Sequence, residues 1–524
     1  MTSFPGHQPQ RVATSNRGMV STAHPGATAA GATILEAGGN AVDAAVAAAL
    51  ALGVCEPAAS GLGGQTMMMI HLADEGRTIA LDGSSRAPHR ATVESFGDLA
   101  RERRRGHRAT TVPSSPATYD YALSRYGALG LGDVLQPAIR LAEEGYEVSE
   151  LQERLTTRER KHLRRSPGAA SLFLRHGRHP YRKGAVFRQP VLASTLGRLA
   201  TVGMDDFYHG EIARLIAADM DANGGLIQAD DLAQIPVPIE REPLDGRFHD
   251  LQVHTMPPPG AGRTLIQMMN VYQSLPSEPR DLDSPDGAVL FAETIRQAFQ
   301  DRQDRPFHPE VYPQVDEKVM LSRKYARRLA SRIHHMAIGK GETTHLSVMD
   351  AAGNAVALTQ SIENVYGACA ASPELGFLYN NYLSAYEYED ATHPYYLRPN
   401  AVPWASVAPT LAFSDGQCCL AIGSPGSERI APAVLQVMIR LEEQSPPAAV
   451  DAPRLHCSLD GEVSLEAPRM SDEIPAALEQ RGFTVRRREA YAFYLGCVQL
   501  VKREGDQFIG VADPRRDGTA AGPG

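Results

Sequence analysis

The segment TTHLSVMDAAGNAVALTQS, residues 343–361, constrains the fold more than any other part of the chain. Two runs rich in Val, Leu, Thr and Ala flank the short turn AAGN, a pattern that predicts a β-hairpin. Thr343 and Ser361 lie at equal distances before and after the turn centre, near Ala352. In a regular hairpin these two side chains are neighbours at the open end. The sequence therefore predicts that two hydroxyl groups meet at the end of a strand pair.

Strand patterns continue through the second half of the chain, whereas the first half consists mainly of helical patterns. HLSVMD, AVALTQSI, GFLYNN, PTLAFSD and CCLAIGS alternate with glycine-containing turns. Earlier, HPGATAAGATILEAGG and NAVDAAVAAALALGV predict two helices; Gly38 and Gly39 end the first, and Asn40 caps the second. This division predicts an α+β fold. We expect the polar, glycine-rich tail from Asp513 to be disordered.

Composition excludes several classes of protein. The formal net charge of −9 argues against a nucleic acid as the main partner. The six cysteines show no CxxC spacing, so we expect reduced thiols and neither a disulfide framework nor a metal site. The most apolar early run, residues 44–55, is shorter than the roughly 20 residues of a membrane span. No signal peptide is evident at the start. We therefore predict a cytoplasmic enzyme with no membrane span and no cofactor.

The hydroxyl of Thr343 suggests a nucleophile. A hydroxyl is weakly nucleophilic until a base removes its proton. A threonine at the start of a chain can use its own α-amine, whose ordinary pKa of about 7.7–8.0 is close to neutral pH. This chemistry requires cleavage of the chain before Thr343. This stretch alone favours the alternative interpretation, in which Thr343 and Thr344 are ordinary strand residues.

A second segment, LAIGSPGSERIAPAVLQVM, predicts a strand, a glycine-containing turn and a helix. Backbone N–H groups at such a turn can stabilise a developing oxyanion. An ordinary connection between a strand and a helix is the alternative interpretation.

Taken together, these segments resemble the γ-glutamyltranspeptidase family of N-terminal nucleophile hydrolases. The resemblance extends from about Gly18 to the C-terminal region. It rests on the order and spacing of GMVSTAHPGATAAGATILEAGGNAVDAAVAAALAL, SGLGG, LQPAIRLAEEGY, MPPPGAGRTLIQ, TTHLSVMDAAGNAVALTQS, NN at 380–381, and GSPGSERI.

The resemblance implies a four-layer αββα sandwich, made as a precursor that cleaves itself between Glu342 and Thr343. The products would be a large chain, 1–342, and a small chain, 343–524, which stay associated. Thr343 would then form an acyl-enzyme with a small-molecule amide or peptide-like substrate. Water or an amine would accept the acyl group.

The resemblance also assigns roles to individual residues of the catalytic machinery. Ser361 falls where the family usually has a second Thr that hydrogen-bonds the nucleophile. Gly426 and Ser427 fall on the family's pair of oxyanion-binding glycines. If the turn requires a positive φ at Ser427, this residue is strained, because a side chain disfavours that conformation.

The sequence departs from the family in the pocket that holds the donor's carboxylate. Ser84 stands where the family has an Arg, and Arg86 follows two residues later. Ala405 and Ser406 stand at the family's pair of serines. Each lost contact to a charged ligand group typically costs about 1.5–3 kcal/mol. An efficient γ-glutamyl site is therefore not expected unless Arg86 compensates.

The residues that would hold the donor's α-amino group are also replaced. Glu363, Tyr382 and Ala385 stand where the family has an Asn, a Gln and an Asp. Of these, Glu363 retains a clear means of binding a substrate ammonium or amide N–H. Tyr382, Trp404 and Tyr366 either make the pocket more aromatic or pack in the core.

We therefore predict an autoprocessed N-terminal threonine hydrolase or acyltransferase whose donor is not a standard γ-glutamyl group. Three alternatives remain. The chain could be a genuine γ-glutamyltransferase or glutathione hydrolase with substituted contacts. It could be a natural-product pathway homologue that cleaves a carbon–carbon bond to an oxalyl-type group. It could also be an unprocessed, non-catalytic binding scaffold.

Overall fold

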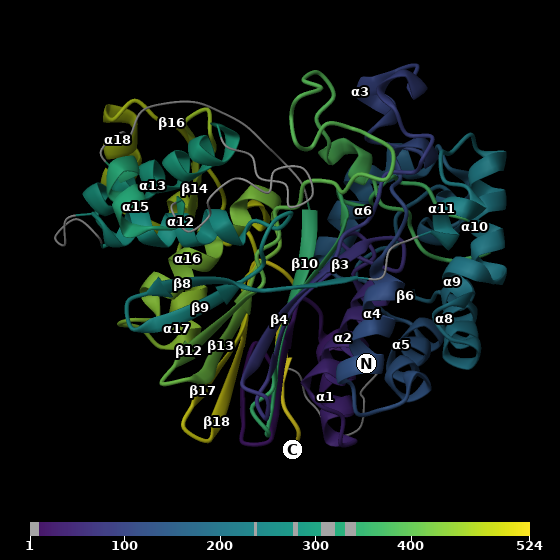
Figure 1. Ribbon diagram of the computed structural model, residues 1–524, viewed down its shortest axis with the longest axis horizontal. Helices are drawn as coiled ribbons and strands as arrows, with labels where there is room; N and C mark the ends of the chain where they lie inside the picture. The colour runs from purple at the N-terminus through teal and green to yellow at the C-terminus, as the bar shows by residue number, and fades with distance from the viewer. Residues whose placement is uncertain (1–9, 235–237, 276–280, 305–319, 331–341) are drawn as a thin grey trace.

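The computed structural model describes residues 10–234, 238–275, 281–304, 320–330 and 342–524. Within these residues, two antiparallel sheets of seven strands each lie face to face, and helices cover the outer face of each sheet (Figure 1). This is a four-layer αββα sandwich, so the predicted fold class is confirmed.

The first sheet has the predicted hairpin at its centre. The strand β10 (Glu342–Asp350) pairs with β11 (Ala355–Glu363), and Leu346 lies opposite Leu358, which centres the hairpin on Ala352 as predicted. In order across the sheet, the strands are β19 (Thr519–Ala521), β2 (Gly18–Thr22), β10, β11, β3 (Gln65–Leu72), β4 (Arg77–Gly83) and β7 (Ile239–Arg241).

The second sheet packs against the inner face of the first. Its strands, in order, are β1 (Val12–Ser15), β18 (Gln507–Ala512), β17 (Gln499–Glu504), β13 (Gln417–Gly423), β12 (Thr410–Ser414), β9 (Leu251–Thr255) and β8 (Leu244–Phe248). Met69 and Ala357 from the first sheet join Leu411 and Ile422 from the second in one buried apolar cluster. Burial of this cluster between the two sheets is a main source of stability, because apolar area removed from water favours folding.

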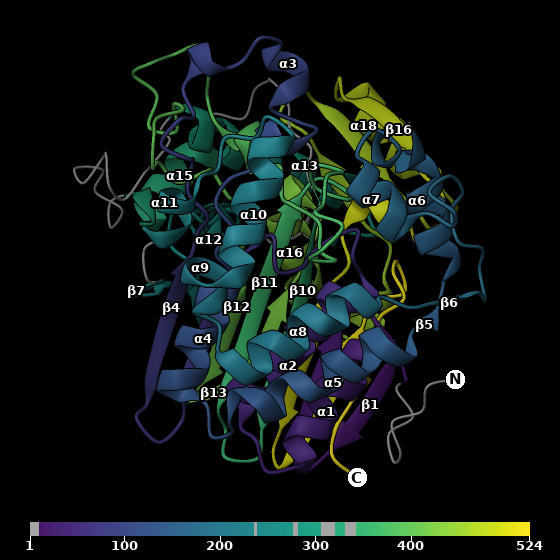
Figure 2. The ribbon, with the colours of Figure 1, turned by 90° about the vertical axis from the view of Figure 1, so that its right-hand side faces the viewer.

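Helices on the outside of the first sheet include the two that the sequence predicts. The helix α1 (Pro25–Glu36) ends before Gly38, and α2 (Ala41–Cys55) begins after Asn40. The Asn40 side chain accepts a hydrogen bond from the Asp43 backbone N–H, and the Asp43 side chain accepts one from the Asn40 backbone N–H. This capping box confirms the predicted start. Figure 2 shows α2 in front of the sheet with α5 (Leu131–Glu144) and α8 (Pro190–Val202).

Several further helices complete this side of the molecule. They are α4 (Ser115–Tyr126), α6 (Glu150–Leu163), α7 (Pro167–Phe173), α9 (Asp206–His209), α10 (Glu211–Ala222) and α11 (Ala229–Ala233), with the short strands β5 (Tyr146–Glu147) and β6 (Val186–Phe187).

A second layer of helices covers the other sheet. It contains α12 (Gly262–Gln273), α13 (Pro285–Asp304), α15 (Arg323–Ala330), α16 (Ile430–Arg440), α17 (Pro446–Asp451) and α18 (Glu473–Gln480). The small sheet β14 (Leu455–Cys457), β15 (Glu462–Leu465) and β16 (Thr484–Arg487) adjoins this layer. Among the described residues, none of the helices combines the length and the apolar character that crossing a membrane requires.

The C-terminal tail is ordered, so the prediction of disorder is wrong. Residues Thr519–Ala521 form β19 and pair with β2. Before it, Asp513 is fully buried and lies 2.6 Å from Arg454 Nη2 and 3.1 Å from Arg515 Nη1. The two guanidinium groups lower the pKa of Asp513 despite its burial. Composition suggested disorder because the tail is polar and rich in glycine, whereas the ion-pair and strand partners that hold it lie far away in the sequence.

Candidate active site

Thr343 lies at the end of β10, next to an irregularity in the hairpin. Glu342 pairs with Glu363 and Thr344 pairs with Gln360, so β11 contributes one residue more than β10 between these pairs. This is a β-bulge, which redirects side chains locally. Thr343 Oγ1 nevertheless donates a hydrogen bond to Ser361 Oγ at 3.5 Å. The predicted meeting of two hydroxyls is confirmed, at the long limit of a hydrogen bond.

Ser361 is held in place by other groups. Its hydroxyl oxygen accepts a hydrogen bond from the Glu363 backbone N–H at 2.8 Å. The Tyr382 phenol is hydrogen-bonded to Ser361 and to Gln65. Burial, and secondarily the charge of Glu363, raises the pKa of Tyr382 above its ordinary value, so the phenol remains protonated and able to donate. The nucleophile candidate therefore contacts a fixed, buried hydroxyl rather than a mobile one.

The second predicted element, the glycine-containing turn, follows β13 and leads into α16. Gly426 has a φ of 121° and Ser427 a φ of 55°, both in the left-handed region. The condition for strain at Ser427 is therefore met, because a residue with a Cβ in this region costs about 1–2 kcal/mol. Ser427 lines the same cavity as Thr343, whereas Gly426 is not among the described residues that line it.

A cavity of about 190 Å³ joins these elements. It is lined by Arg302, Thr343, Glu363, Tyr382, Ala385, Trp404, Ser406, Val407, Ser427 and Glu428. A second cavity of about 280 Å³ shares four of these residues, namely Arg302, Ala385, Trp404 and Glu428. The two cavities therefore form an inner chamber at Thr343 and an adjoining outer chamber.

The predicted substrate-binding residues divide into two groups. Glu363, Tyr382 and Ser406 line the inner chamber, as does Ala385. Ser84, Arg86 and Ala405 are not among the described residues that line it.

Each member of this second group is engaged elsewhere. Ser84 Oγ donates to Asp82 Oδ1 at 2.5 Å, and Asp82 accepts from Arg241 Nε at 2.8 Å. Arg86 Nη1 donates to the Asn400 carbonyl at 3.1 Å. The Ala405 backbone N–H donates to the Pro259 carbonyl at 3.2 Å.

Sequence reasoning missed the two charged residues that line both chambers. Arg302 lies on α13, and its guanidinium carbon is 3.7 Å from the centre of the Trp404 ring. Burial lowers the pKa of Arg302 to about 10, so this side chain stays charged at neutral pH. Burial also raises the pKa of Glu428. The pattern around Arg302 indicated only an amphipathic helix, and no local signal connects residues 302, 404 and 428.

Two of the neighbouring ring residues belong to the core. The Tyr366 hydroxyl is 2.6 Å from Thr156 Oγ1, and Tyr366 does not line the chamber, which supports the core-packing interpretation for this residue. His345 is fully buried between Thr359 Oγ1 at 2.8 Å and Ser347 Oγ at 3.1 Å. Strand alternation places His345 on the same face of β10 as Thr343.

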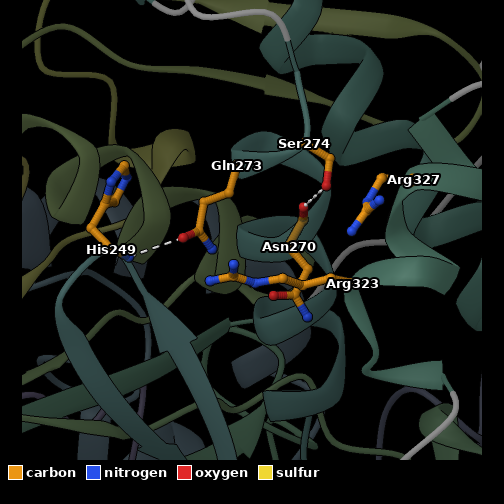
Figure 3. Close-up of a pocket in the computed structure, with 6 residues that line it drawn as sticks. All are labelled: His249, Asn270, Gln273, Ser274, Arg323 and Arg327. Atoms are coloured by element: carbon orange, nitrogen blue, oxygen red, sulfur yellow. Dashed lines mark hydrogen bonds between the residues drawn. The ribbon is translucent and has the colours of Figure 1, made fainter.

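A larger cavity, of about 390 Å³, lies apart from Thr343 (Figure 3). It is lined by His249, Asn270, Gln273, Ser274, Arg323 and Arg327, and it shares no residue with either chamber. The Ser274 hydroxyl donates to the Asn270 carbonyl, as Figure 3 shows. Since that serine has no base beside it among the residues drawn, the smaller chamber is the better candidate for an active site.

Comparisons with known proteins identify the family to which the chain is similar. The family model for Gamma-glutamyltranspeptidase matches residues 27–523. An Acylase ACY 1 proenzyme from Pseudomonas sp. (strain SE83) is 35% identical over 97% of this chain and 94% of its own length. A glutathione hydrolase proenzyme from Escherichia coli (strain K12) is 33% identical over 96% of this chain and 91% of its own. The crystal structure of a cephalosporin acylase from Bacillus halodurans superposes with a TM-score of 0.88, at 28% identity, over 100% of this chain and 98% of that one.

Proposed function

The chain belongs to the gamma-glutamyltranspeptidase family of hydrolases and acyltransferases, and we propose that Thr343 is its nucleophile. The observation that carries this proposal is the position of the Thr343 hydroxyl. It is hydrogen-bonded to Ser361 and borders a chamber that also reaches the turn at Ser427. Acyl transfer requires a nucleophile, a group that orients it and backbone N–H donors for the oxyanion, all at one chamber.

Cleavage of the precursor comes first. The strand β10 runs through the bond between Glu342 and Thr343, and residues 331–341 lie outside the described residues. Thr343 Oγ1 attacks the carbonyl carbon of Glu342, and the peptide nitrogen becomes the free α-amine of Thr343. Water then hydrolyses the resulting ester, giving the chains 1–342 and 343–524.

The two chains would stay together because their strands alternate in one sheet. In the first sheet, β10 and β11 lie between β2 and β3, and β19 lies at the edge beside β2. The strands β2, β3, β4 and β7 come from the large chain, and the others from the small chain. Separation would break several backbone hydrogen-bond ladders and expose buried apolar surface.

Turnover uses the same groups. The α-amine of Thr343 accepts the proton of its own hydroxyl as Oγ1 attacks the carbonyl carbon of an amide-type donor. The backbone N–H groups of Gly426 and Ser427 stabilise the oxyanion. The intermediate collapses to an acyl-enzyme, and the amine leaves after taking up the proton. Water or a second amine then attacks the ester and restores Thr343.

The donor would differ from a standard γ-glutamyl group, because Ser84 is engaged with Asp82 and supplies no positive charge. Glu363 supplies a negative charge near Thr343 and would bind a substrate ammonium or amide N–H. The alternative of ordinary γ-glutamyl hydrolysis remains, since a glutathione hydrolase proenzyme is among the relatives.

The proposal is tested with the processed protein and a panel of acyl p-nitroanilides, with and without hydroxylamine. Release of nitroaniline together with formation of the acyl hydroxamate, both absent in Thr343→Ala, is the expected result. Hydrolysis that persists in Thr343→Ala would contradict the role of this residue. Inclusion of γ-glutamyl-p-nitroanilide in the panel tests the alternative donor directly.

A further inference from the structure

The cavity of about 390 Å³ in Figure 3 is lined mainly by side chains from α12 and α15, and we call it the α12–α15 cavity. Its lining is polar throughout: His249, Asn270, Gln273, Ser274, Arg323 and Arg327, with no carboxylate among the described residues that line it. Figure 3 shows His249 and Arg327 at opposite ends, with Gln273, Asn270 and Ser274 between them. A volume of this size is ordinary for a small-molecule site, for which the range is about 300–1,000 Å³.

Two guanidinium groups give the cavity its charge. Arg323 and Arg327 are four residues apart on α15, so they lie on the same face of the helix. The helix sequence, RKYARRLA, contains no acidic residue that could pair with them. Among the residues that the structure describes, neither guanidinium has an ion pair, whereas the exposed Arg214 on α10 pairs with Glu211. Like charges at this spacing destabilise a helix, and such a departure from a local rule is typical of a functional site.

The third basic group of the cavity has its own counter-charge. His249 Nε2 lies 2.6 Å from Glu442 Oε1, so a positive charge on the imidazole is offset by that carboxylate. The His249 backbone N–H donates to Gln273 Oε1 at 2.9 Å, which fixes the amide beside it. The uncompensated charge of the cavity is therefore that of the two arginines.

The helix that carries the two arginines is held firmly against its neighbours. Tyr325 is 6% exposed and packs with Val271 of α12, and its hydroxyl donates to Asp301 of α13. Asn270 Nδ2 donates to the Leu321 carbonyl at 2.8 Å, which ties the start of the helix to α12. Groups that are fixed before a ligand arrives lose less entropy when it binds.

We propose that the α12–α15 cavity binds a phosphate monoester, with the phosphate group at Arg323 and Arg327. Such a phosphate carries about −1.5 to −2 charges at pH 7, which matches two guanidinium groups, whereas a carboxylate supplies one charge. The planar guanidinium fork also matches phosphate oxygens bidentately. The site is separate from the acyl-transfer chemistry, because the cavity shares no residue with the inner or the outer chamber.

The organic part of the ester has a place beside the phosphate. A cavity of about 560 Å³ shares Asn270 and Arg323 with the α12–α15 cavity. Its lining also includes Arg247 and three carboxylates, those of Asp245, Asp250 and Asp415. These carboxylates repel a second anionic group and accept hydrogen bonds from hydroxyl groups. The organic part is therefore neutral and hydroxylated, as it is in a sugar phosphate.

Four ligands separate these contributions in isothermal titration calorimetry of the purified protein at neutral pH and constant ionic strength. They are glucose 6-phosphate, glucuronate (a carboxylate at the same end of the sugar), glucose and inorganic phosphate. We expect glucose 6-phosphate to bind with a Kd roughly 10- to 100-fold lower than that of glucuronate, because the second guanidinium gains a charge-assisted hydrogen bond. Inorganic phosphate should bind more weakly than the ester, and glucose should not bind. Any of the three binding as tightly as glucose 6-phosphate would overturn the proposal.

Variants of α15 assign the binding to the two arginines. Arg323→Gln and Arg327→Gln should each raise the Kd of glucose 6-phosphate about 10-fold, and the double variant should lose binding. Both side chains are exposed, so these variants should fold, which urea unfolding without ligand checks. Arg328→Gln is the matched control, because Arg328 is an exposed arginine of the same helix that stacks on Tyr325 at 4.6 Å and does not line either cavity.

The outcomes that contradict the proposal are equally specific. An unchanged Kd in the double variant would overturn it, as would an equal loss of affinity in Arg328→Gln, since the effect would then follow the overall charge of the helix. The titration is repeated with Thr343→Ala, in which the Kd should be unchanged. Loss of binding in that variant would place the ligand at the inner chamber and overturn the proposal, whereas the proposed role of Thr343 is tested separately by donor hydrolysis.

Discussion

Replacement of Ser361 by alanine tests the link between the hairpin and the chemistry. Ser361 is 1% exposed, and its oxygen is bonded to three groups: the Thr343 hydroxyl, the Glu363 backbone N–H and the Tyr382 phenol. The variant Ser361→Ala removes all three contacts and little volume. Its effects on stability and on rate can therefore be worked out separately.

The loss of stability comes mainly from Glu363. Its backbone N–H would lose the 2.8 Å bond to Ser361, and loss of this bond at a partly buried donor costs about 1–3 kcal/mol. Tyr382 keeps its bond to Gln65, so it adds less. The free energy of unfolding should therefore fall by about 1–3 kcal/mol.

The loss of rate comes from Thr343. A neutral hydrogen bond is worth about 0.5–1.5 kcal/mol, which corresponds to a roughly 2- to 12-fold fall in kcat/KM. Urea unfolding measures the first effect and donor hydrolysis by the processed protein the second. Ser361→Thr keeps the hydroxyl and should restore most of the rate.

A buried serine on the neighbouring strand provides the control. Ser347 is fully buried on β10, and its hydroxyl is bonded to His345 and donates to the Gln499 carbonyl, but it does not line the chamber. Ser347→Ala should therefore lower stability without a comparable fall in kcat/KM. The reasoning is refuted if Ser361→Ala reacts at the wild-type rate, or if Ser347→Ala slows the reaction as much.

Three further predictions follow from the site and its surroundings. Glu363→Gln should lower kcat/KM for a γ-glutamyl donor roughly 10-fold or more relative to a glutaryl donor, because only the former carries an ammonium group; an unchanged ratio would argue against Glu363 as its partner. Ser427→Gly should raise the free energy of unfolding by about 0.5–1 kcal/mol, since relief of the strain at a φ of 55° exceeds the added chain entropy; urea unfolding that shows no gain would contradict this. Burial lowers the pKa of His345 to about 3, so the unfolded chain takes up a proton below pH 6.5 that the folded chain does not. The stability that neutral His345 contributes is therefore present above pH 6.5 and is lost as the pH falls towards 3. Between pH 7.5 and 5, the free energy of unfolding of the wild type should fall by about 2 kcal/mol more than that of His345→Gln in urea titrations.

Local patterns in the sequence were sufficient to predict the secondary-structure elements around the proposed nucleophile. The hairpin register follows from counting residues equally on both sides of Ala352. The start of α2 follows from the capping residue Asn40, which stands three positions before Asp43. The bulge beside Thr343 has no such local signal, because it depends on how β11 meets its neighbours. The edge strand β19 was missed for the same reason, since its partner β2 lies almost five hundred residues away in the chain.

The chamber was predictable only in part. Glu363 and Tyr382 lie within forty residues of Thr343, and both line it. Arg302 on α13, Trp404 in a loop and Glu428 in the short 3-10 helix Ser427–Arg429 meet there only in the folded chain. The search for a carboxylate-binding Arg accordingly centred on Arg86, whereas the cavity contains Arg302.

The intact mass of the purified protein, measured beside that of Thr343→Ala, shows whether the chain is cleaved before Thr343. Two chains are expected in the wild type, with masses that correspond to residues 1–342 and 343–524, and a single full-length chain is expected in the variant. A wild-type protein that remains one uncut chain after long incubation would contradict the assignment of Thr343 as an N-terminal nucleophile.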